Sequence, residues 1–260
     1  MRAKQRLKDL MLTSARALGF GSTRELGALV LCHHRIDGTG RPLTLSLEAF
    51  RRQMIYFRDH GAHWMTLAEL GAALESGEVP SRAVCVTFDD AARSTYEPIQ
   101  WLLGIGGRCT QFAVVKWVSE GPPEWMGWDE LRRLSELGVE IGSHTVDHLD
   151  LRGLGPDRLG AQLQNSRARL EAAVGREITS FAYPYGRFDA AVVRAVKAAG
   201  YRWACTTQHV HAVSGFAPYL IPRYEAADPE VVAELFDGRA WMFYGTLQSC
   251  LLMRNRVLAR

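Results

Sequence analysis

The sequence has no long hydrophobic run, few cysteines and almost no net charge. No stretch of about 18 apolar residues occurs in the 260 residues, so we expect no membrane-spanning helix. The five cysteines are scattered without a C-x-x-C pair, which indicates reduced thiols rather than a disulfide framework. Lys and Arg number 31 against 28 Asp and Glu, a balance that gives no sign of nucleic-acid binding.

Several functional motifs are also absent. There is no phosphate-binding loop, no Gly-rich dinucleotide fingerprint and no nucleophile elbow. The N-terminus is basic but has no apolar core and no A-x-A cleavage site, so we expect no secretory signal and a cytoplasmic location. What remains is 47% hydrophobic and 23% charged, values that are typical of a folded globular protein and exclude disordered, collagen-like and coiled-coil classes.

Two terminal segments flank one predicted domain, a barrel over residues 27–238. Residues 1–26 form an amphipathic, basic segment, and residues 239–260 are apolar and aromatic before they end in arginines. One interpretation is that both are helices packed on the domain. The other is peripheral contact with an anionic membrane, which would suit a lipid-linked substrate and the inner membrane face.

Short apolar runs alternate with helical periods along the rest of the chain. The predicted strands are 28–34, 83–88, 109–115, 139–142, 178–183, 201–206 and 218–224. The predicted helices are 47–60, one from Thr66 to about Gly77, 94–103, 128–137, 157–174, 188–199 and 229–237. Ser46 is a natural N-cap, and Thr66 with Glu69 forms a capping box. About seven such units predict a parallel sheet closed into a single barrel.

Polar residues follow the strands, where barrel enzymes carry their chemistry. They are His33 and His34, Asp89 and Asp90, His144 and His148, the segment 183–186, and Arg223. These are the residue types of metal binding and acid–base catalysis.

The segment 87–90 (TFDD) ends the most apolar strand. Of its two adjacent carboxylates, one can bind a cation while the other acts as a base; the alternative is a turn with a helix cap. His144 and His148 are four residues apart and can present both rings to one metal, although a chance surface pair has the same spacing. Together with Asp90 they supply two nitrogens and one oxygen, the ligand types of a catalytic zinc site.

These motifs, with the segments 128–148 (WDELRRLSELGVEIGSHTVDH) and 178–189 (ITSFAYPYGRFD), resemble the polysaccharide deacetylases of carbohydrate esterase family 4, the NodB-homology group. The resemblance covers about residues 28–225 and implies a single distorted (β/α)7 barrel. It implies that Asp90, His144 and His148 hold the metal and that Asp89 is the general base. It also implies that the backbone N–H of Tyr185 stabilises the oxyanion and that a histidine protonates the leaving amine.

The sequence departs from the family pattern in several places. Ala91 replaces the usual Gly after the aspartates, which is compatible with a negative φ. Ala182 replaces the Arg that orients the base, and Arg223 could supply that charge from another strand. The late Leu-x-His and Asp-Trp motifs are missing.

The missing acid has a candidate on the first strand. The segment 31–36 (LCHHRI) is similar to that of the circularly permuted poly-N-acetylglucosamine deacetylases, whose acid histidine lies there. Since neighbouring strand residues face opposite ways, His33 and His34 cannot both point into the site, and we expect His34 to be the acid. The alternative is two strand histidines without a catalytic role.

The resemblance implies a hydrolase that removes the acetyl group from an N-acetylated amino sugar of a glycan, glycolipid or glycoside. We expect Zn²⁺ in the site, with Co²⁺ or Ni²⁺ also compatible. The expected substrate contacts are Tyr183 and Pro184, as a rigid wall, and Trp128, which could instead be packing. The alternatives are a related hydrolase of another amide, a glycan-binding relative without strong activity, and a membrane-associated assembly factor.

Overall fold

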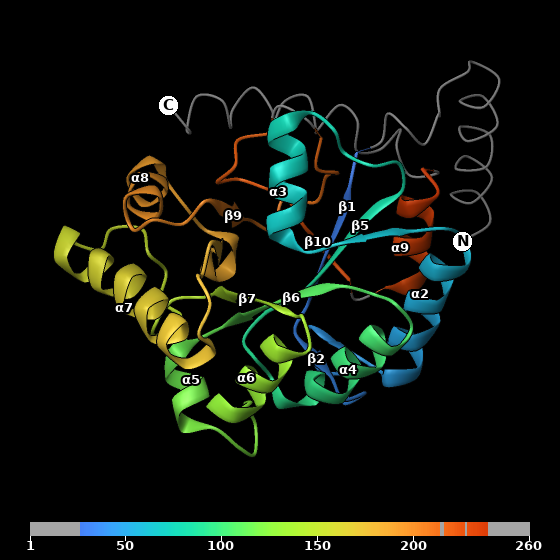
Figure 1. Ribbon diagram of the computed structural model, residues 1–260, viewed down its shortest axis with the longest axis horizontal. Coiled ribbons are helices and arrows are strands. Elements are labelled where there is room, and N and C mark those ends of the chain that lie inside the picture. Colours follow the sequence, from blue (N-terminus) through green and yellow to red (C-terminus); the bar gives the residue numbers. More distant parts are fainter. Residues whose placement is uncertain (1–26, 214–215, 227, 239–260) are drawn as a thin grey trace.

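A curled parallel β-sheet lies at the centre of the computed structural model (Figure 1), which describes residues 27–213, 216–226 and 228–238. The strands are β1 (Leu29–His33), β2 (Arg35–Ile36), β3 (Thr44–Leu45), β4 (His63–Met65), β5 (Ala83–Phe88), β6 (Cys109–Ala113), β7 (Glu140–Ser143), β8 (Ser180–Ala182), β9 (Trp203–Cys205) and β10 (Tyr224–Glu225). The expected terminal segments, 1–26 and 239–260, lie outside the described residues.

The eight-stranded sheet has the order β10-β1-β5-β6-β7-β8-β9, with β4 also paired to β5, and all its pairs are parallel. An isolated parallel bridge between Cys205 and Ile221 joins β9 to the segment that leads into β10. The sheet therefore curls round until its two ends meet, which confirms the predicted distorted barrel. Strands β2 and β3 form a separate pair.

Helices surround this sheet in Figure 1. They are α2 (Leu47–Asp59), α3 (Leu67–Ser76), α4 (Tyr96–Gly104), α5 (Val115–Glu120), α6 (Trp128–Glu136), α7 (Pro156–Val174), α8 (Ala190–Ala198) and α9 (Pro229–Phe236), with 3-10 turns η1 (Arg93–Thr95) and η2 (Pro184–Gly186). The predicted caps are confirmed: Ser46 accepts a hydrogen bond from the Ala49 N–H, and Thr66 and Glu69 form the capping box. Among the described residues, no helix combines the length and hydropathy that crossing a bilayer requires.

The two faces of the sheet have different neighbours, because side chains alternate along each strand. Leu29, Leu31, Val84 and Val86 belong to an outer core shared with the surrounding helices. The side chains that face the barrel interior form a second cluster with α3. Its strand members are Val30, Cys85, Phe112 and Trp203, and its helix members are Leu67, Leu70 and Leu74. Helix α3 therefore closes the end of the barrel at which the strands begin.

Two glycines allow this interior to pack closely. A Cβ on Gly71 of α3 would lie 2.3 Å from the Trp203 ring, and one on Gly142 of β7 would lie 2.4 Å from the Phe112 ring. Any larger residue at either position would displace an aromatic side chain from the barrel interior. Gly142 comes two residues before His144, so this packing also fixes the strand that carries that histidine.

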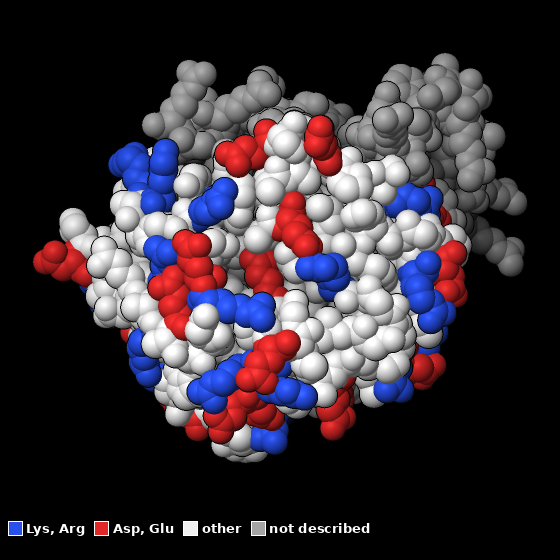
Figure 2. Space-filling view, viewed as in Figure 1, with Lys and Arg blue, Asp and Glu red and all other residues white. Residues whose placement is uncertain are grey.

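The structure differs from the predicted elements mainly where strands are short. The expected strand 218–224 is reduced to Tyr224–Glu225 and the single bridge at Ile221, since Pro218 and Pro222 have no N–H for a ladder. β4, α5 and the β2–β3 pair were not predicted, because each is too short to show a periodic pattern. Charges of both signs are interspersed over the face in Figure 2, as the near-neutral composition predicts.

Candidate active site

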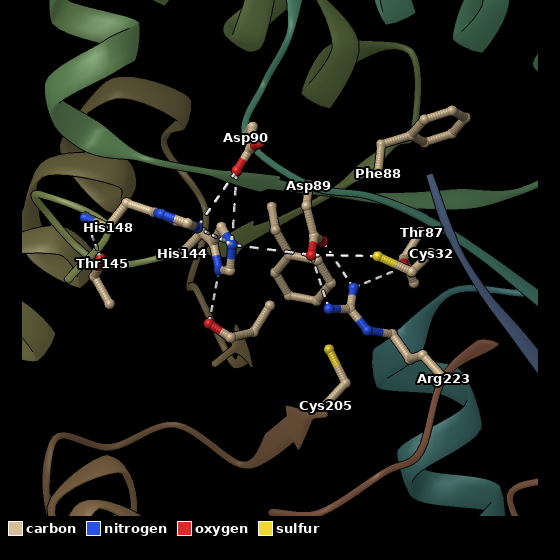
Figure 3. Close-up of polar contacts among 12 residues, drawn as sticks. Cys32, Thr87, Phe88, Asp89, Asp90, His144, Thr145, His148, Cys205 and Arg223 are labelled. Carbon is tan, nitrogen blue, oxygen red and sulfur yellow. Dashed lines mark hydrogen bonds and ion pairs between the residues drawn. The ribbon is translucent and has the colours of Figure 1, made fainter. Parts of the chain in front are cut away.

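Asp89 lies just beyond the end of β5 and points into the barrel, where its carboxylate forms an ion pair with Arg223 (Figure 3). Nη1 of Arg223 donates to Oδ1 at 2.7 Å and Nη2 donates to Oδ2 at 2.8 Å. Arg223 is fully buried and Asp89 is 2% exposed. A bidentate pair of this kind fixes both the position and the plane of the carboxylate.

Further contacts hold Arg223 in this orientation. Its Nη1 also donates to Oγ1 of Thr87 at 2.9 Å, and its Nε donates to the carbonyl of Thr206 at 3.1 Å. Burial raises the pKa of Asp89, but the charge of Arg223 and its hydrogen bonds to the carboxylate lower it more, and the net pKa is well below its ordinary value. Asp89 is therefore held as an oriented anion, and Arg223 lies beside it, as expected.

Asp90, His144 and His148 converge beside Asp89 and offer one ligand atom each to a common point. The Nε2 atoms of the two histidines are 3.1 Å apart, and each is 3.7 Å from Oδ1 of Asp90 (Figure 3). Ligands about 2.1 Å from a tetrahedral zinc are about 3.4 Å from one another. The three residues therefore fit a divalent cation without rearrangement.

A hydrogen bond fixes the orientation of the His144 ring. Nδ1 of His144 is 2.8 Å from the carbonyl of Ala182, to which it must donate, so Nε2 keeps its lone pair. Oδ1 of Asp90 is buried and has no hydrogen-bond partner. Such an orphaned acceptor is costly unless a cation or proton meets it.

Electrostatics point the same way. Burial and then the charge of Asp89 raise the pKa of Asp90 to about 7, against the smaller opposing effects of Arg35 and Arg223. Burial and the neighbouring His144 lower the pKa of His148 to about 3, and burial also lowers the pKa of His144. The two rings are therefore neutral, as metal ligation requires.

Strained backbone is concentrated at this site. Seven described residues other than glycine have positive φ, and five of them lie here: Asp90 (72°), Ala91 (57°), Thr145 (73°), His148 (57°) and Tyr185 (59°). Each such residue costs on the order of 1 kcal/mol or more, a cost that is typical of functional sites. Ala was expected to be compatible with this turn if its φ were negative; the φ of Ala91 is positive, and its carbonyl accepts a hydrogen bond from the Met126 N–H.

The two strand histidines face opposite ways, as the alternation predicted. The His33 ring is 4% exposed and packs against Phe50 and Phe88 on the outer face. His34 is half-buried on the inner side, where a ring nitrogen, the Cys32 sulfur and an Asp89 oxygen all lie within 4.8 Å of one another. The structure thus brings His34, and not His33, to the base.

The turn after β8 places its residues on two sides. The Tyr185 ring is 57% exposed and lies 4.6 Å from the His148 ring, at the mouth of the site. Tyr183 is fully buried among Phe181 and Phe188 in the outer core, and Pro184 is buried too. This placement corrects the expectation that the Tyr183 side chain and Pro184 line the site.

The tryptophans are also split between the outer core and the site. Trp128, the expected sugar contact, packs on the outer core with the Arg169 guanidinium over its ring. Trp117 instead lies 4.9 Å from the His148 ring and stacks on Trp125 at 4.4 Å. The aromatic surface beside the candidate metal ligands is therefore built from Trp117, Trp125 and Tyr185, and Trp128 is not part of it.

Sequence reasoning missed two buried polar residues. Cys32 donates from Sγ to Oδ2 of Asp89 at 3.4 Å, and its position two residues before His34 was the signal that both share the inner face. Glu140 lies inside the opposite end of the barrel and accepts hydrogen bonds from Thr110, Ser180 and the Ala68 N–H. A carboxylate at the start of a buried strand was its only sequence signal.

A comparison with known proteins agrees with this geometry. The family model described as polysaccharide deacetylase matches residues 76–204. A candidate polysaccharide deacetylase of Bacillus subtilis, YxkH, is 28% identical over 181 residues, which cover 69% of this chain and 64% of that protein. The match thus spans slightly less than two thirds of that relative's length.

Two further relatives extend over more of the chain. The poly-beta-1,6-N-acetyl-D-glucosamine N-deacetylase of Staphylococcus aureus (strain MRSA252) is 24% identical over 247 residues, covering 83% of this chain and 84% of that protein. The solved structure of the Streptococcus pyogenes deacetylase PplD in complex with acetate has a TM-score of 0.74 at 20% identity, and covers 81% of this chain and 97% of that one. The structural likeness establishes a shared fold.

Proposed function

Since this chain belongs to the polysaccharide deacetylase family, we propose that it is a metal-dependent hydrolase of the N-acetyl amide of an amino sugar. The reaction adds water across the amide, breaks the C–N bond, and releases acetate and a free amine. The single observation that carries the proposal is the adjacency of an anion held by Arg223 to three converging metal-ligand atoms.

Asp90, His144 and His148 would hold the cation, and two nitrogens with one oxygen suit Zn²⁺, with Co²⁺ or Ni²⁺ as alternatives. When bound, a divalent cation polarises a carbonyl and makes water more acidic. Neutral rings and the unsatisfied Oδ1 of Asp90 are the features of the protein that favour this role.

Asp89 would remove the proton from the attacking water. Its Oδ2 is 3.9 Å from Nε2 of His144, so the base faces the ligand group directly. The pairing with Arg223 keeps the carboxylate ionised and points it at the same place in every turnover.

The leaving nitrogen needs a proton, and His34 would deliver it from the inner end of β1. Its neighbours within the barrel are Asp89 and Cys32. The turn that holds Tyr185 lies against His148, where the Tyr185 N–H would stabilise negative charge on the carbonyl oxygen.

The proposal is tested by amine release from soluble and lipid-linked N-acetylhexosamine substrates, with and without chelator. We expect release that chelation abolishes and added Zn²⁺ restores, together with stoichiometric metal in the purified protein. A protein that holds no metal and gains no activity from added Zn²⁺ would be a glycan-binding relative instead. Preference for a formyl or other acyl group in a substrate panel would identify the related amide hydrolase.

We also propose a cytoplasmic location with peripheral contact at the inner membrane face, on the basic and apolar composition of residues 1–26 and 239–260. This contact would bring the site to a lipid-linked sugar. Flotation with anionic liposomes tests it. The full chain should float and a chain that lacks residues 241–260 should float less, whereas equal recovery in the soluble fraction would contradict the proposal.

A further inference from the structure

Within the described residues, the Arg35 guanidinium forms no hydrogen bond, which distinguishes it from Arg223 and Arg187. Arg223 is occupied by Asp89, and Arg187 pairs with Asp150 at 3.1 Å. Within the described part of the chain, no oxygen accepts a hydrogen bond from the Arg35 side chain; the nearest carboxylate oxygen is that of Glu124, at 3.9 Å. Glu124 is itself 63% exposed and does not immobilise the cation.

A ring, and not an acid, holds Arg35 in place. Its guanidinium carbon lies 5.0 Å from the centroid of the Trp125 ring, and only 29% of the side chain is exposed. A guanidinium over an aromatic face is attracted through the face of the cation, which leaves its in-plane N–H groups available. Among the described residues, the Arg35 guanidinium is therefore held in place without a hydrogen-bond acceptor, and its ion pair there is the long contact with Glu124.

The loop that carries Trp125 is attached to the turn after the two aspartates. Trp125 pairs with Ala92 in an antiparallel bridge, and the Met126 N–H donates to the Ala91 carbonyl at 2.9 Å. The stack continues from Trp125 through Trp117 to the metal-ligand candidate His148. Arg35 thus lies at the end of an aromatic surface that begins at the ligand group.

A substrate whose acetamido group sits at Asp90 and His148, and which extends along Trp117 and Trp125, would place a neighbouring substituent near the free edge of Arg35. That edge matches the two oxygens of a phosphate or carboxylate.

We propose that Arg35, held on Trp125, is a specificity-determining residue that binds an oxyanion, a phosphate or a carboxylate, on the N-acetylated sugar or its immediate neighbour. This inference rests on the proposed function. It makes the preferred substrate an anionic amino-sugar conjugate and not a neutral homopolymer. It also implies that an ammonium group, which deacetylation of a neighbouring sugar creates, is disfavoured at this position.

Three substrates separate the possible sources of binding. Methyl N-acetylglucosaminide is neutral, N-acetylglucosamine 1-phosphate carries the phosphate, and a disaccharide of N-acetylglucosamine with glucuronic acid carries the carboxylate. The wild-type chain is compared with Arg35→Gln, with Arg35→Lys, and with Arg133→Gln, which removes the same charge from an exposed pair with Glu136 on α6. The measured quantity is kcat/KM for amine release.

We expect Arg35→Gln to lower kcat/KM about 10- to 100-fold on at least one anionic substrate, while the neutral substrate changes by less than about 3-fold. Arg35→Lys should recover only part of the loss, since one ammonium cannot reproduce the fork. Arg133→Gln should match the wild type. The anionic substrate, phosphate or uronic acid, whose kcat/KM falls more identifies the oxyanion.

Equal losses on all three substrates, or no loss on any, would overturn the role of Arg35 while leaving the deacetylase proposal intact. Absence of amine release from every substrate by the wild type would instead reject the proposed function. Calorimetric binding of the two anionic substrates to Asp89→Asn gives a readout without turnover. Binding of at least one of them should weaken by a similar factor when Arg35→Gln is added, and unchanged binding of both contradicts the inference.

Discussion

The barrel interior buries a carboxylate at each end, and the two are treated in opposite ways. Where the strands end, Asp89 is paired with Arg223 beside Oδ1 of Asp90, which has no hydrogen-bond partner among the described residues. Where the strands begin, Glu140 forms no ion pair with a described residue and accepts hydrogen bonds from the hydroxyls of Thr110 and Ser180 and from the N–H of Ala68, in the first turn of α3.

The difference shows how a structural polar site can be told from a functional one. The Glu140 network is complete, since each carboxylate oxygen has a donor and no atom of that side chain is left unsatisfied. The Asp89 end combines a fixed charge, an orphaned Oδ1 on Asp90 and several residues with positive φ. A stable protein keeps such incomplete and strained groups where a ligand completes them.

The difference between the two ends is tested most strongly by neutralising each carboxylate in turn. Asp89→Asn should lower kcat about 10²- to 10⁴-fold, because an amide cannot take the proton from water. Metal content measured on the purified variant should stay at the wild-type level, since Asp90, His144 and His148 remain. Substantial activity in a folded Asp89→Asn variant would remove Asp89 from the role of base.

Removing the guanidinium of Arg223 tests whether the Asp89–Arg223 pair at the strand ends is held by charge. Arg223→Met should destabilise the fold by about 3–5 kcal/mol, because it leaves Asp89 buried and unpaired. Urea denaturation of the single variant and of Arg223→Met with Asp89→Asn measures the coupling. The double variant should lose less stability than the sum of the two single variants; strictly additive losses would show that the two side chains do not interact.

His33, the last residue of β1, and His34, which follows it, provide a matched pair within the functional end. His34→Ala should lower kcat about 10²-fold through loss of the proton donor. His33→Ala is the control, because that ring packs between Phe50 and Phe88; it should lower the free energy of unfolding and leave kcat nearly unchanged. The assignment fails if His34→Ala turns over normally while Asp89→Asn does not.

The predictability of the two ends from sequence differs in the same way. Alternation and strand ends were enough to place Asp89, Asp90, His144, His148 and the inner face of His34, because these are local properties. The outward orientation of Tyr183 and the positive φ of Ala91 could not be read, since both depend on how the curled sheet meets its neighbours.

Long-range partners were harder still. Arg223 was matched to Asp89 only as a guess, as the two are 134 residues apart and meet through closure of the barrel. Glu140 was not noticed at all, because its donors come from β6, β8 and the first turn of α3. A polar network made from four separate elements leaves no spacing in the sequence.

The smallest expected effect belongs to Glu140→Gln. Its amide can accept from the Ala68 N–H and Thr110 and donate to Ser180, so the free energy of unfolding at neutral pH should change by about 1 kcal/mol or less, with kcat unaffected.

The pH dependence of the effect of Glu140→Gln on stability is more informative. Burial raises the pKa of Glu140 above its ordinary value of 4.5, against the effect of its hydrogen bonds. The folded state therefore holds this proton more tightly than the unfolded state does, and folding is favoured at low pH. As the pH rises from the unfolded pKa through the raised folded pKa, wild-type stability should fall relative to Glu140→Gln, and the difference should then become constant. Urea midpoints of both proteins from pH 4 to 8 measure this, and a difference that does not change with pH would mean that Glu140 is as well solvated by its three donors as by water.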